Sequence, residues 1–254
     1  MNTFDVVSLN LSDFQTVSLE DMKKIRLMNR TDTKYVFTTK TLEAILAMSA
    51  DDYMVQKTDG FTVAPYHTAY LDTPDMAMYL AHQCGHRKRE KIRVRTYLAS
   101  SLSFLEVKNK NNKGRTDKRR IMIEDPTNLD ETLADGFLAK NAWYMMQQLT
   151  PTLENRFQRI TLVNKAMTER LTIDTGIRFR NLINGNYVSL PSLVVMELKR
   201  DGRTDSPVLR TLQQLRVKPS GFSKYCMGCA MTNADLKQNR FKKRIRKIRH
   251  LTTN

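Results

Sequence analysis

The sequence predicts an α+β fold in which an antiparallel sheet curls around a charged interior, with helices packed outside it. Three observations support this prediction. Seven segments after residue 65 alternate apolar and polar residues with a period of two, as half-buried strands do. The polar positions of most of these segments are cationic, whereas an ordinary wet sheet face carries mixed signs. The chain also has 42 Lys and Arg against 26 Asp and Glu, a net charge of +16.

Length and composition indicate one folded domain with a tail. The chain has 254 residues, of which 41% are hydrophobic and 27% charged, and these values exclude wholesale disorder. We find no internal repeat or low-complexity linker, so we expect a domain over residues 1–235 and a basic C-terminal tail over residues 236–254. The tail is expected to be a mobile segment or a peripheral helix.

Helices are predicted before, between and after the strands. Residues 16–30 and 39–49 have helical patterns, with Ser18 and Thr39 as candidate caps, and they frame the segment TDTKYVF. Residues 128–149 also have a helical pattern despite Gly136. Ser206-Pro207 opens another helix, because proline suits the first turn.

Strands are predicted where short runs of period two are bounded by Asn, Gly, Asp or Pro. Their side chains alternate between the two sheet faces, so the polar members of each run share one face. Examples are Lys91, Arg93 and Arg95, the pair Lys118 and Arg120, and the pair Glu197 and Lys199. The predicted strands cover residues 66–73, 91–98, 103–110, 118–124, 157–163, 170–179 and 192–200.

Converging cations would repel one another. Two charges about 6 Å apart repel by about 3 kcal/mol at an effective dielectric constant near 20. A ligand with several closely spaced negative charges relieves this repulsion, and Arg guanidinium groups fit phosphate oxygens in a bidentate manner. Glu106 and Glu197 lie on the same faces as the cations. We expect them either to bind a divalent metal or to hold the cations in position. The alternative for any single strand is an ordinary solvated face, but this explanation weakens when six strands share the pattern.

Eight segments, taken in order, resemble the VTC domain, the catalytic domain of the eukaryotic polyphosphate polymerase. This family belongs among the triphosphate tunnel metalloenzymes, and the resemblance spans about residues 24–232. It implies an antiparallel eight-stranded β-barrel tunnel that binds ATP and Mn²⁺ or Mg²⁺ and transfers the γ-phosphate to a growing polyphosphate chain. The segments are DTKYVF, YHTAYLDT, KIRVRTY, FLEVK, FQR, ERLTIDT, VVMELK and FSKY.

The resemblance also implies roles for individual residues. It implies a metal-ligand role for Glu197 and, as a second carboxylate, for Glu106. His82 stands where the eukaryotic proteins have a basic residue, and Arg156 lies three residues before Arg159 as a surface cation or a ligand. The residues expected in catalysis are Arg93, Arg95, Lys108, Arg159, Arg170 and Glu197, and those expected to bind ATP phosphates are Lys34, Lys118, Arg120, Lys199 and Lys224.

Several alternatives remain open at this point. The same fold is compatible with an inorganic triphosphatase, and the net charge with a non-catalytic binder of polyphosphate or nucleic acid. Nucleic acid is disfavoured because the chain lacks the sequence signatures of the common binding modules. Cys226 and Cys229 have the spacing of half a zinc site, although two small apolar side chains on a short helix are the simpler explanation.

The sequence also indicates a location. It has no apolar run long enough to span a bilayer, its first residues do not resemble a signal peptide, and three cysteines make no disulfide framework. We therefore expect a cytoplasmic protein, peripheral to the inner face of a membrane if the basic tail binds anionic lipid or a membrane-protein partner.

Overall fold

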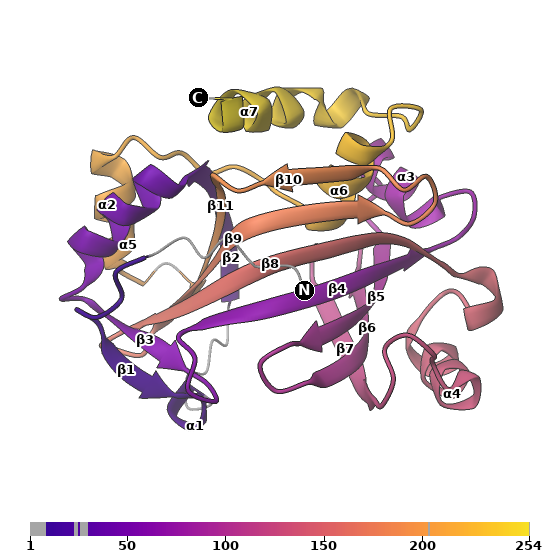
Figure 1. Ribbon diagram of the computed structural model, residues 1–254, viewed down its shortest axis with the longest axis horizontal. Coiled ribbons are helices and arrows are strands. Elements are labelled where there is room, and N and C mark those ends of the chain that lie inside the picture. Colours follow the sequence, from indigo (N-terminus) through magenta and orange to yellow (C-terminus); the bar gives the residue numbers. More distant parts are fainter. Residues whose placement is uncertain (1–8, 23–24, 26–29, 203, 254) are drawn as a thin grey trace.

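A curved, mostly antiparallel sheet forms the centre of the computed structural model, which describes residues 9–22, 25, 30–202 and 204–253 (Figure 1). The sheet has eleven strands, and eight of them follow one another along a single path. All seven predicted strands lie on this path. In spatial order the eight are β2 (Arg30–Thr38), β11 (Leu193–Asp201), β9 (Glu169–Asn181), β8 (Thr150–Asn164), β4 (Val63–Asp72), β5 (Arg89–Tyr97), β6 (Leu102–Lys110) and β7 (Thr116–Ile123).

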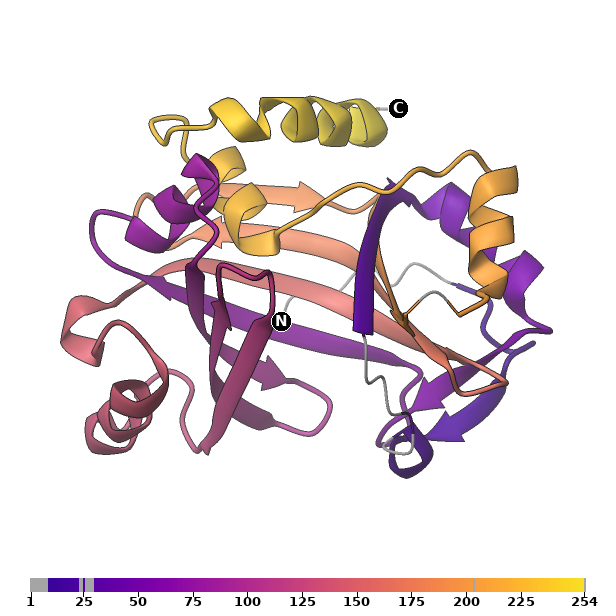
Figure 2. The same ribbon diagram turned by 180° about the vertical axis from the view of Figure 1, so that it is seen from behind.

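The predicted fold class is confirmed, but the predicted closure of the barrel is wrong. The two end strands of the path, β2 and β7, do not pair with each other in the described part of the chain. The free edge of β2 bonds instead to residues 219–220, which precede the helix that begins at Lys224. There the Ser220 N–H donates to the Lys34 carbonyl at 2.7 Å, and Tyr35 forms a β-bridge with Pro219. The sheet is therefore a deep trough with one open side, as seen from behind in Figure 2.

Three short strands extend the sheet beyond the main path. The first is β1 (Gln15–Ser18), which runs parallel to β3 (Tyr53–Lys57), and β3 in turn pairs with β8. The third, β10 (Tyr187–Leu190), pairs with β9. None of the three was predicted, because each is too short to show a periodic pattern.

The predicted helix over residues 16–30 is wrong for most of its described part. Residues 15–18 form β1 because Val17 is buried and this stretch aligns with β3. Only α1 (Leu19–Met22) is helical, and Ser18 does cap it, accepting the Asp21 N–H at 3.1 Å. Residues 23–24 and 26–29 lie outside the described residues, and Arg30 already begins β2.

The other predicted helices form, with a different cap in one case and different boundaries in another. Thr38, and not Thr39, caps α2 (Thr39–Ser49), and α5 (Pro207–Gln214) begins at the predicted proline. The predicted helix 128–149 forms only as α4 (Glu131–Asn141), followed by a 3₁₀ turn at Met146–Gln148. It ends early because the Trp143 N–H donates to the Glu90 carboxylate at 3.0 and 3.1 Å, which pulls the chain out of helical geometry.

Helices cover the convex face of the trough in two groups. The first group, α2 and α5, packs on β2, β11, β9 and β8 through a core that contains Leu42, Ile160 and Leu212. The second group is the single helix α4, which packs on β5 and β6 through Phe137 and Leu138. The outward side chains of these strands are therefore apolar where helices cover them.

A third group closes one end of the concave face. It contains α3 (Ala77–Cys84) and α6 (Lys224–Thr232), which Ser223 caps. Gly228 lets α6 approach the sheet, because a Cβ at this position would lie 2.4 Å from Leu153 Cδ2 and 2.6 Å from Phe179 Cδ1. As a result α6 lies inside the trough and directs its first residue into the remaining space.

The basic C-terminal segment forms a helix that packs against this third group. A 3₁₀ turn (Asn239–Phe241) leads into α7 (Lys242–Thr253), and Phe241, Ile245 and Ile248 are buried in the same core as α6. The cationic side chains of α7 remain largely exposed. No helix in the described ranges has the length and apolar character that a membrane crossing requires.

Candidate functional site

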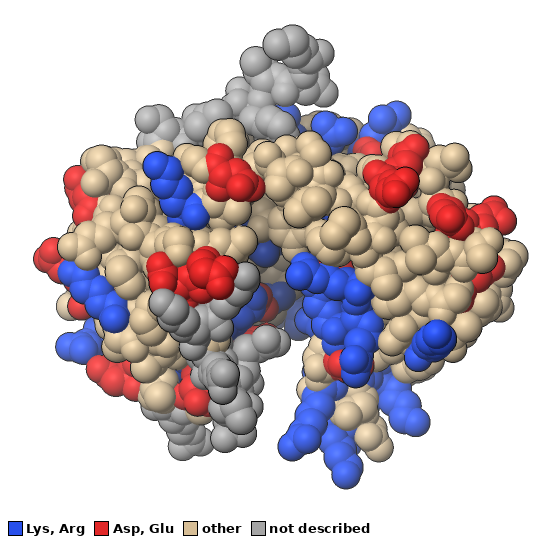
Figure 3. Space-filling view, turned by 90° about the horizontal axis from the view of Figure 1, so that it is seen from below, with Lys and Arg blue, Asp and Glu red and all other residues tan. Residues whose placement is uncertain are grey.

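The concave face of the trough collects the polar side chains that alternate along its strands. In the strand registers Lys34 lies opposite Glu197, Arg93 opposite Glu106, and Arg159 opposite Asp174. Figure 3 shows the molecule hollowed between its two sides, with Lys and Arg atoms inside the hollow and along one wall. Cations from seven strands and one helix therefore face a common space.

The first of three ion clusters in this space surrounds Glu106. Its carboxylate accepts hydrogen bonds from Arg93 Nε at 2.7 Å and from Lys118 Nζ. The Glu106 side chain is only 1% exposed. Burial opposes its ionisation, but Arg93, Arg95 and Lys118 outweigh this effect and lower the pKa of Glu106 to about 2. Glu106 is therefore a buried counter-ion that holds two cations in position.

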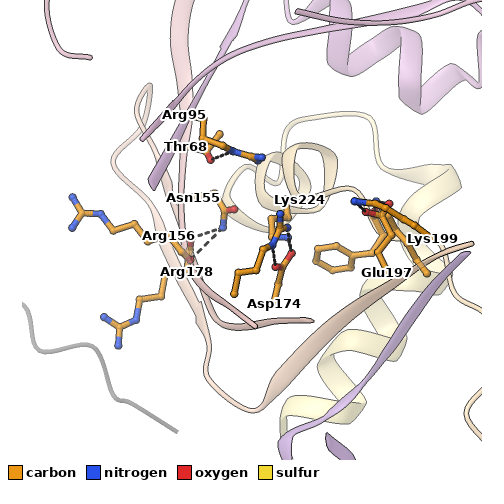
Figure 4. A network of polar contacts seen from close by, with 12 residues as sticks. Thr68, Arg95, Asn155, Arg156, Asp174, Arg178, Glu197, Lys199 and Lys224 are labelled. Carbon is orange, nitrogen blue, oxygen red and sulfur yellow. Dashed lines mark hydrogen bonds and ion pairs between the residues drawn. The ribbon is translucent and has the colours of Figure 1, made fainter. Parts of the chain in front are cut away.

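The second cluster surrounds Asp174 on β9 (Figure 4). Arg159 donates to it in a bidentate manner, Nε to Oδ1 at 2.6 Å and Nη2 to Oδ2 at 2.8 Å, and Lys224 of α6 donates to Oδ2. The Arg159 guanidinium also lies 5.1 Å above the Tyr66 ring. Burial opposes ionisation, but the two cations hold the pKa of Asp174 well below its usual range. This cluster ties α6 to the sheet.

The third cluster surrounds Glu197 on β11. Lys34 Nζ lies 3.3 Å from Oε1 and Lys199 Nζ lies 3.2 Å from Oε2. Burial raises the pKa of Glu197, but the two lysines outweigh it and lower this pKa to about 2. The Glu197 side chain is 19% exposed, against 1% for Glu106 and 5% for Asp174. Of the three carboxylates, Glu197 is the one that a ligand in the trough can reach most easily.

Three further cations have no carboxylate partner among the described residues. Lys91 donates to Ser223 Oγ at 2.8 Å and Arg95 donates to Thr68 Oγ1 at 3.3 Å, and both acceptors are neutral hydroxyl groups. Lys108 forms no ion pair with any of the described residues. Burial, reinforced by nearby cations, lowers the pKa of Lys108 to about 8 and that of Arg95 to about 10. The free site thus carries uncompensated positive charge, and an anionic ligand would relieve it.

The structure brings most of the predicted site residues together but leaves two at the margins. Arg170 lies at the end of the trough near α1, where its Nη2 donates to the Met22 carbonyl at 3.1 Å. Arg120 lies on the edge strand β7, 4.5 Å above the Phe104 ring. In contrast, Arg156 points away from the trough, as Figure 4 shows, and is a surface cation on the outer face of β8.

Two residues of the site were not among the predicted ones. Asp174 is the counter-ion of Arg159 and Lys224, and Lys91 continues the cationic row of β5. Both could have been found from the period of two, because Asp174 shares a face with Arg170 and Thr172, and Lys91 shares one with Arg93. The sequence could not show that Ser223, at the start of α6, would contact Lys91.

The donor set limits how the trough could hold a metal ion. In the parts of the chain that the structure describes, no three His, Cys, Asp or Glu side chains come together. Cys226 and Cys229 are buried, unpaired thiols on α6, and Cys226 Sγ lies 3.1 Å from His82 Nδ1. A protein-only metal cage is therefore not formed by these residues. One carboxylate fits Mg²⁺ or Mn²⁺ bound to phosphate, because such ions take most of their ligands from phosphate and water.

Comparisons with solved structures return proteins of low sequence identity. A candidate adenylate cyclase from Vibrio parahaemolyticus is 14% identical, with a TM-score of 0.46 over 80% of this chain and 99% of that protein. One from Bacillus halodurans is 12% identical, with a TM-score of 0.44 over 84% and 99%. A candidate adenylyl cyclase from Hippeastrum, for which a dominant triphosphatase activity is described, is 13% identical, with a TM-score of 0.45 over 81% and 97%.

The sequence itself was compared with curated proteins and with models of protein families. None of the curated proteins matches it significantly. The model of the VTC domain matches residues 29–233, which include every strand that lines the trough. Because this match covers well over half of the chain, the protein belongs to the VTC domain family.

Proposed function

We propose that the protein is a metal-dependent phosphotransferase that adds the terminal phosphate of ATP to a growing inorganic polyphosphate chain within the trough. The observation that carries this proposal is the charge of the concave face. Three carboxylates are each held between two cations, and Lys91, Arg95 and Lys108 remain without an anionic partner among the described residues. A row of condensed phosphates has the charge density and shape to neutralise them.

The proposed reaction needs positioning more than a protein nucleophile. A terminal oxygen of the polyphosphate chain attacks the γ-phosphorus of ATP, the bond from this phosphorus to the bridging β–γ oxygen breaks, and ADP leaves. Charge develops on the transferred phosphoryl oxygens, where fixed guanidinium and ammonium groups stabilise it. Arg159, oriented by a bidentate contact with Asp174 and by the Tyr66 ring, is the donor that we assign to this role.

The remaining cations bind and orient the phosphates around Arg159. Arg93 and Lys118, held by Glu106, form one wall of the trough, and Lys34 and Lys199, held by Glu197, form the opposite wall. We propose further phosphate contacts from the other cations that face into the trough and from the two cations at the margins of the trough. These residues are Lys91, Arg95, Lys108, Arg120, Arg170 and Lys224.

A divalent ion fits best beside Glu197. Its side chain is the most accessible of the three carboxylates, at 19% exposed, whereas the Glu106 side chain is enclosed, at 1% exposed. When bound, Mg²⁺ or Mn²⁺ would neutralise phosphate charge. We therefore assign Glu197 as the metal ligand and Glu106 as a positioning residue, a refinement of the expectation that both carboxylates bind metal.

The experiment that tests this function compares two substrates. Purified protein given ATP and Mn²⁺ should release ADP and form a ladder of polyphosphate on a gel, while tripolyphosphate should release little orthophosphate. Rapid orthophosphate release without a ladder would favour the second candidate, an inorganic triphosphatase, since water would then be the acceptor. Binding without any turnover would identify a non-catalytic polyphosphate binder.

A matched pair of variants assigns the activity to the trough. Arg159→Ala removes the guanidinium clamped by Asp174 and should lower turnover at least about a hundredfold, the usual effect of losing one such donor. Arg156→Ala removes the same group three residues away on the outer face and should leave turnover unchanged. Equal activity of the two variants would contradict the site assignment.

We also propose that the chain divides into residues 1–235 and a basic segment over residues 236–254. We further propose a cytoplasmic location and a membrane-protein partner for this basic segment.

A further inference from the structure

A second cationic cavity lies at the end of the trough, outside the three ion clusters. It has a volume of about 380 Å³ and lies between the end of α3, the start of β5 and the start of α7. Figure 1 shows α7 running across the top of the molecule above α6. The lining residues are His82, Gly85, Arg89, Arg240, Phe241 and Arg244.

The lining of this cavity differs in charge from the trough. It includes three arginines and a histidine but no carboxylate, whereas each ion cluster in the trough has one. A neighbouring cavity of about 320 Å³ shares Gly85 and Arg89 and adds Lys110 and Lys113. The lining residues do not neutralise their own positive charge, so an anion from solution is required to balance it.

Arg240, in the 3₁₀ turn, and Arg244, in α7, lie close to glycines of neighbouring segments. Gly85 has φ +80°, and a Cβ there would lie 2.0 Å from Arg240 Nη1, so the guanidinium lies against the glycine backbone. Phe241 beside it is buried, and Ile245 and Ile248 fix the following helix. Arg244 lies near Gly221, on the segment that leads into α6. Core contacts therefore fix the backbone that carries the two arginines, while both arginine side chains are exposed to solvent.

The cavity continues the cationic row of the trough. Arg89, Lys91, Arg93 and Arg95 alternate along the inner face of β5. Across to β6, Arg89 lies opposite Lys110 and Lys91 lies opposite Lys108. Successive members of such a row are about 6–7 Å apart, so an extended anion can pass from one to the next.

His82 can add an uncharged donor to this row. Cys226 Sγ and His82 Nδ1 lie within hydrogen-bond distance, and burial raises the pKa of the Cys226 thiol, so the thiol keeps its proton. Burial and four nearby cations lower the pKa of His82 to about 3, so the ring is neutral. In the tautomer whose Nδ1 accepts from the thiol, Nε2 carries the ring proton and can donate to an anion. The four cations are Lys91, Arg89, Arg244 and Lys110.

We propose that Arg89, Arg240 and Arg244, with His82, form a second phosphate-binding subsite that holds an inorganic polyphosphate chain several units beyond its reacting end. This inference rests on the proposed function and adds a preference for long chains. Arg240 and Arg244 lie beyond residue 233, where the match to the VTC family ends. The subsite is thus an addition made by the C-terminal segment of this chain.

The test compares a short and a long ligand on the full-length protein. Calorimetric titration with tripolyphosphate and with polyphosphate of about a hundred units should show that R240A/R244A binds the long chain at least about tenfold more weakly, as expected for two lost charged contacts. Its affinity for tripolyphosphate should stay within about twofold of the unchanged protein. The matched control K243A/R246A removes two cations of α7 that do not line the cavity and should bind both ligands normally.

Additional variants separate a binding effect from a folding effect. Because Arg240 packs on Gly85, its loss could destabilise the fold, so melting temperatures are measured for every variant. R240K/R244K keeps both charges and should restore most of the affinity for the long chain. R244E alone, a change at an exposed side chain, should weaken long-chain binding without lowering the melting temperature. Retention of long-chain affinity by R244E and R240A/R244A would overturn the subsite.

Other outcomes distinguish this inference from the proposed function and from lipid binding. If the unchanged protein binds neither tripolyphosphate nor the long chain, the proposed function fails as well. If it binds both and the variants also bind both, only the subsite fails. If R240A/R244A loses binding to phosphatidylserine vesicles but keeps long-chain affinity, the cavity serves lipid headgroups and the inference is overturned.

Discussion

Individual lysines in the trough are surrounded by protein atoms, although Lys108 and Lys118 still expose part of their side chains to solvent. Burial is the largest cause of the lowered pKa of Lys108, Lys118 and Lys224, each of which falls to about 8 from an ordinary value of 10.5. Lys118 and Lys224 keep a carboxylate partner, and Lys108 does not among the described residues. These side chains titrate in a range that solution experiments reach easily.

The titration of these lysines predicts two opposite pH effects. Their protons are lost from the free folded protein above about pH 8, so affinity for tripolyphosphate should fall as pH rises towards 10, and binding near pH 8.5 should take up protons. The unfolded chain keeps these protons up to about pH 10.5, so the free energy of unfolding of the free protein should rise across the same window.

Calorimetry in two buffers of different ionisation enthalpy measures the proton uptake, and urea denaturation at several pH values measures the stability. Lys108→Met should reduce the uptake, because one titrating group is lost. An affinity that stays constant between about pH 7 and pH 10 would contradict the lowered pKa values.

The residues of the site were predictable to the extent that they follow strand alternation. Lys34, Arg93, Arg159 and Glu197 lie on the inner face, where a period of two places them. The pairs within hairpins, such as Arg93 with Glu106, join strands that follow one another in the sequence, but their exact register was not predictable from alternation alone. Pairs between distant segments were not predictable at all from local patterns. Asp174 is an example, since its partner Lys224 comes from a helix 50 residues later.

Among the elements, α6 links the site to the core of the protein. Its first residue, Lys224, reaches Asp174, while its middle contacts the sheet through Gly228. Tyr225 packs against Tyr70 with ring centroids 5.0 Å apart. The position of Lys224 in the trough therefore depends on how closely α6 approaches β8 and β9.

A methyl group added at Gly228 should displace this helix. In Gly228→Ala the new Cβ would lie 2.4 Å from Leu153 and 2.6 Å from Phe179, so either α6 or these side chains must shift. We expect a loss of about 1–3 kcal/mol in the free energy of unfolding, as for other overpacked cores, together with weaker tripolyphosphate binding. Denaturant unfolding and calorimetric titration measure the two effects.

Gly136→Ala in α4 is the matched control, since it makes the same change within a helix where no atom lies within 4 Å of the added Cβ. This variant should gain up to about 1 kcal/mol in stability because alanine favours the helix, and it should bind tripolyphosphate normally. A stable Gly228→Ala protein with full affinity would show that α6 does not position Lys224.

Helices and strands could be predicted where a periodic pattern was long, but not where a segment was short. Seven strands and the helices at α2 and α5 were predicted from periodicity and end signals. The strand β1 was mistaken for helix, because four residues show no clear period and their conformation is set by pairing with β3. The early end of α4 depends on Glu90, a tertiary contact that no local pattern reveals.

The molecule as a whole combines an open trough with a large positive charge. Closure was not predictable from sequence, because the edge of β2 could bond to β7 or to the segment before α6, and local patterns favour neither choice. The observed pairing with residues 219–220 leaves one side of the trough accessible. The net charge of +16 then acts on a concave surface that solvent ions can enter.

Salt should therefore act in opposite directions on stability and on binding. Raising NaCl from about 50 mM to about 500 mM shortens the screening length from more than 10 Å to less than 5 Å, which weakens repulsion among the cations of the free trough. Relief of about 1 kcal/mol would raise the melting temperature of the free protein by about 2–4 °C. The same screening weakens the attraction for tripolyphosphate, so its affinity should fall.

With saturating tripolyphosphate at low salt the repulsion is already neutralised, and added NaCl should lower the melting temperature. Thermal unfolding and titration at matched salt concentrations measure both responses. A free protein that loses stability in NaCl would show that its cations do not strain the trough.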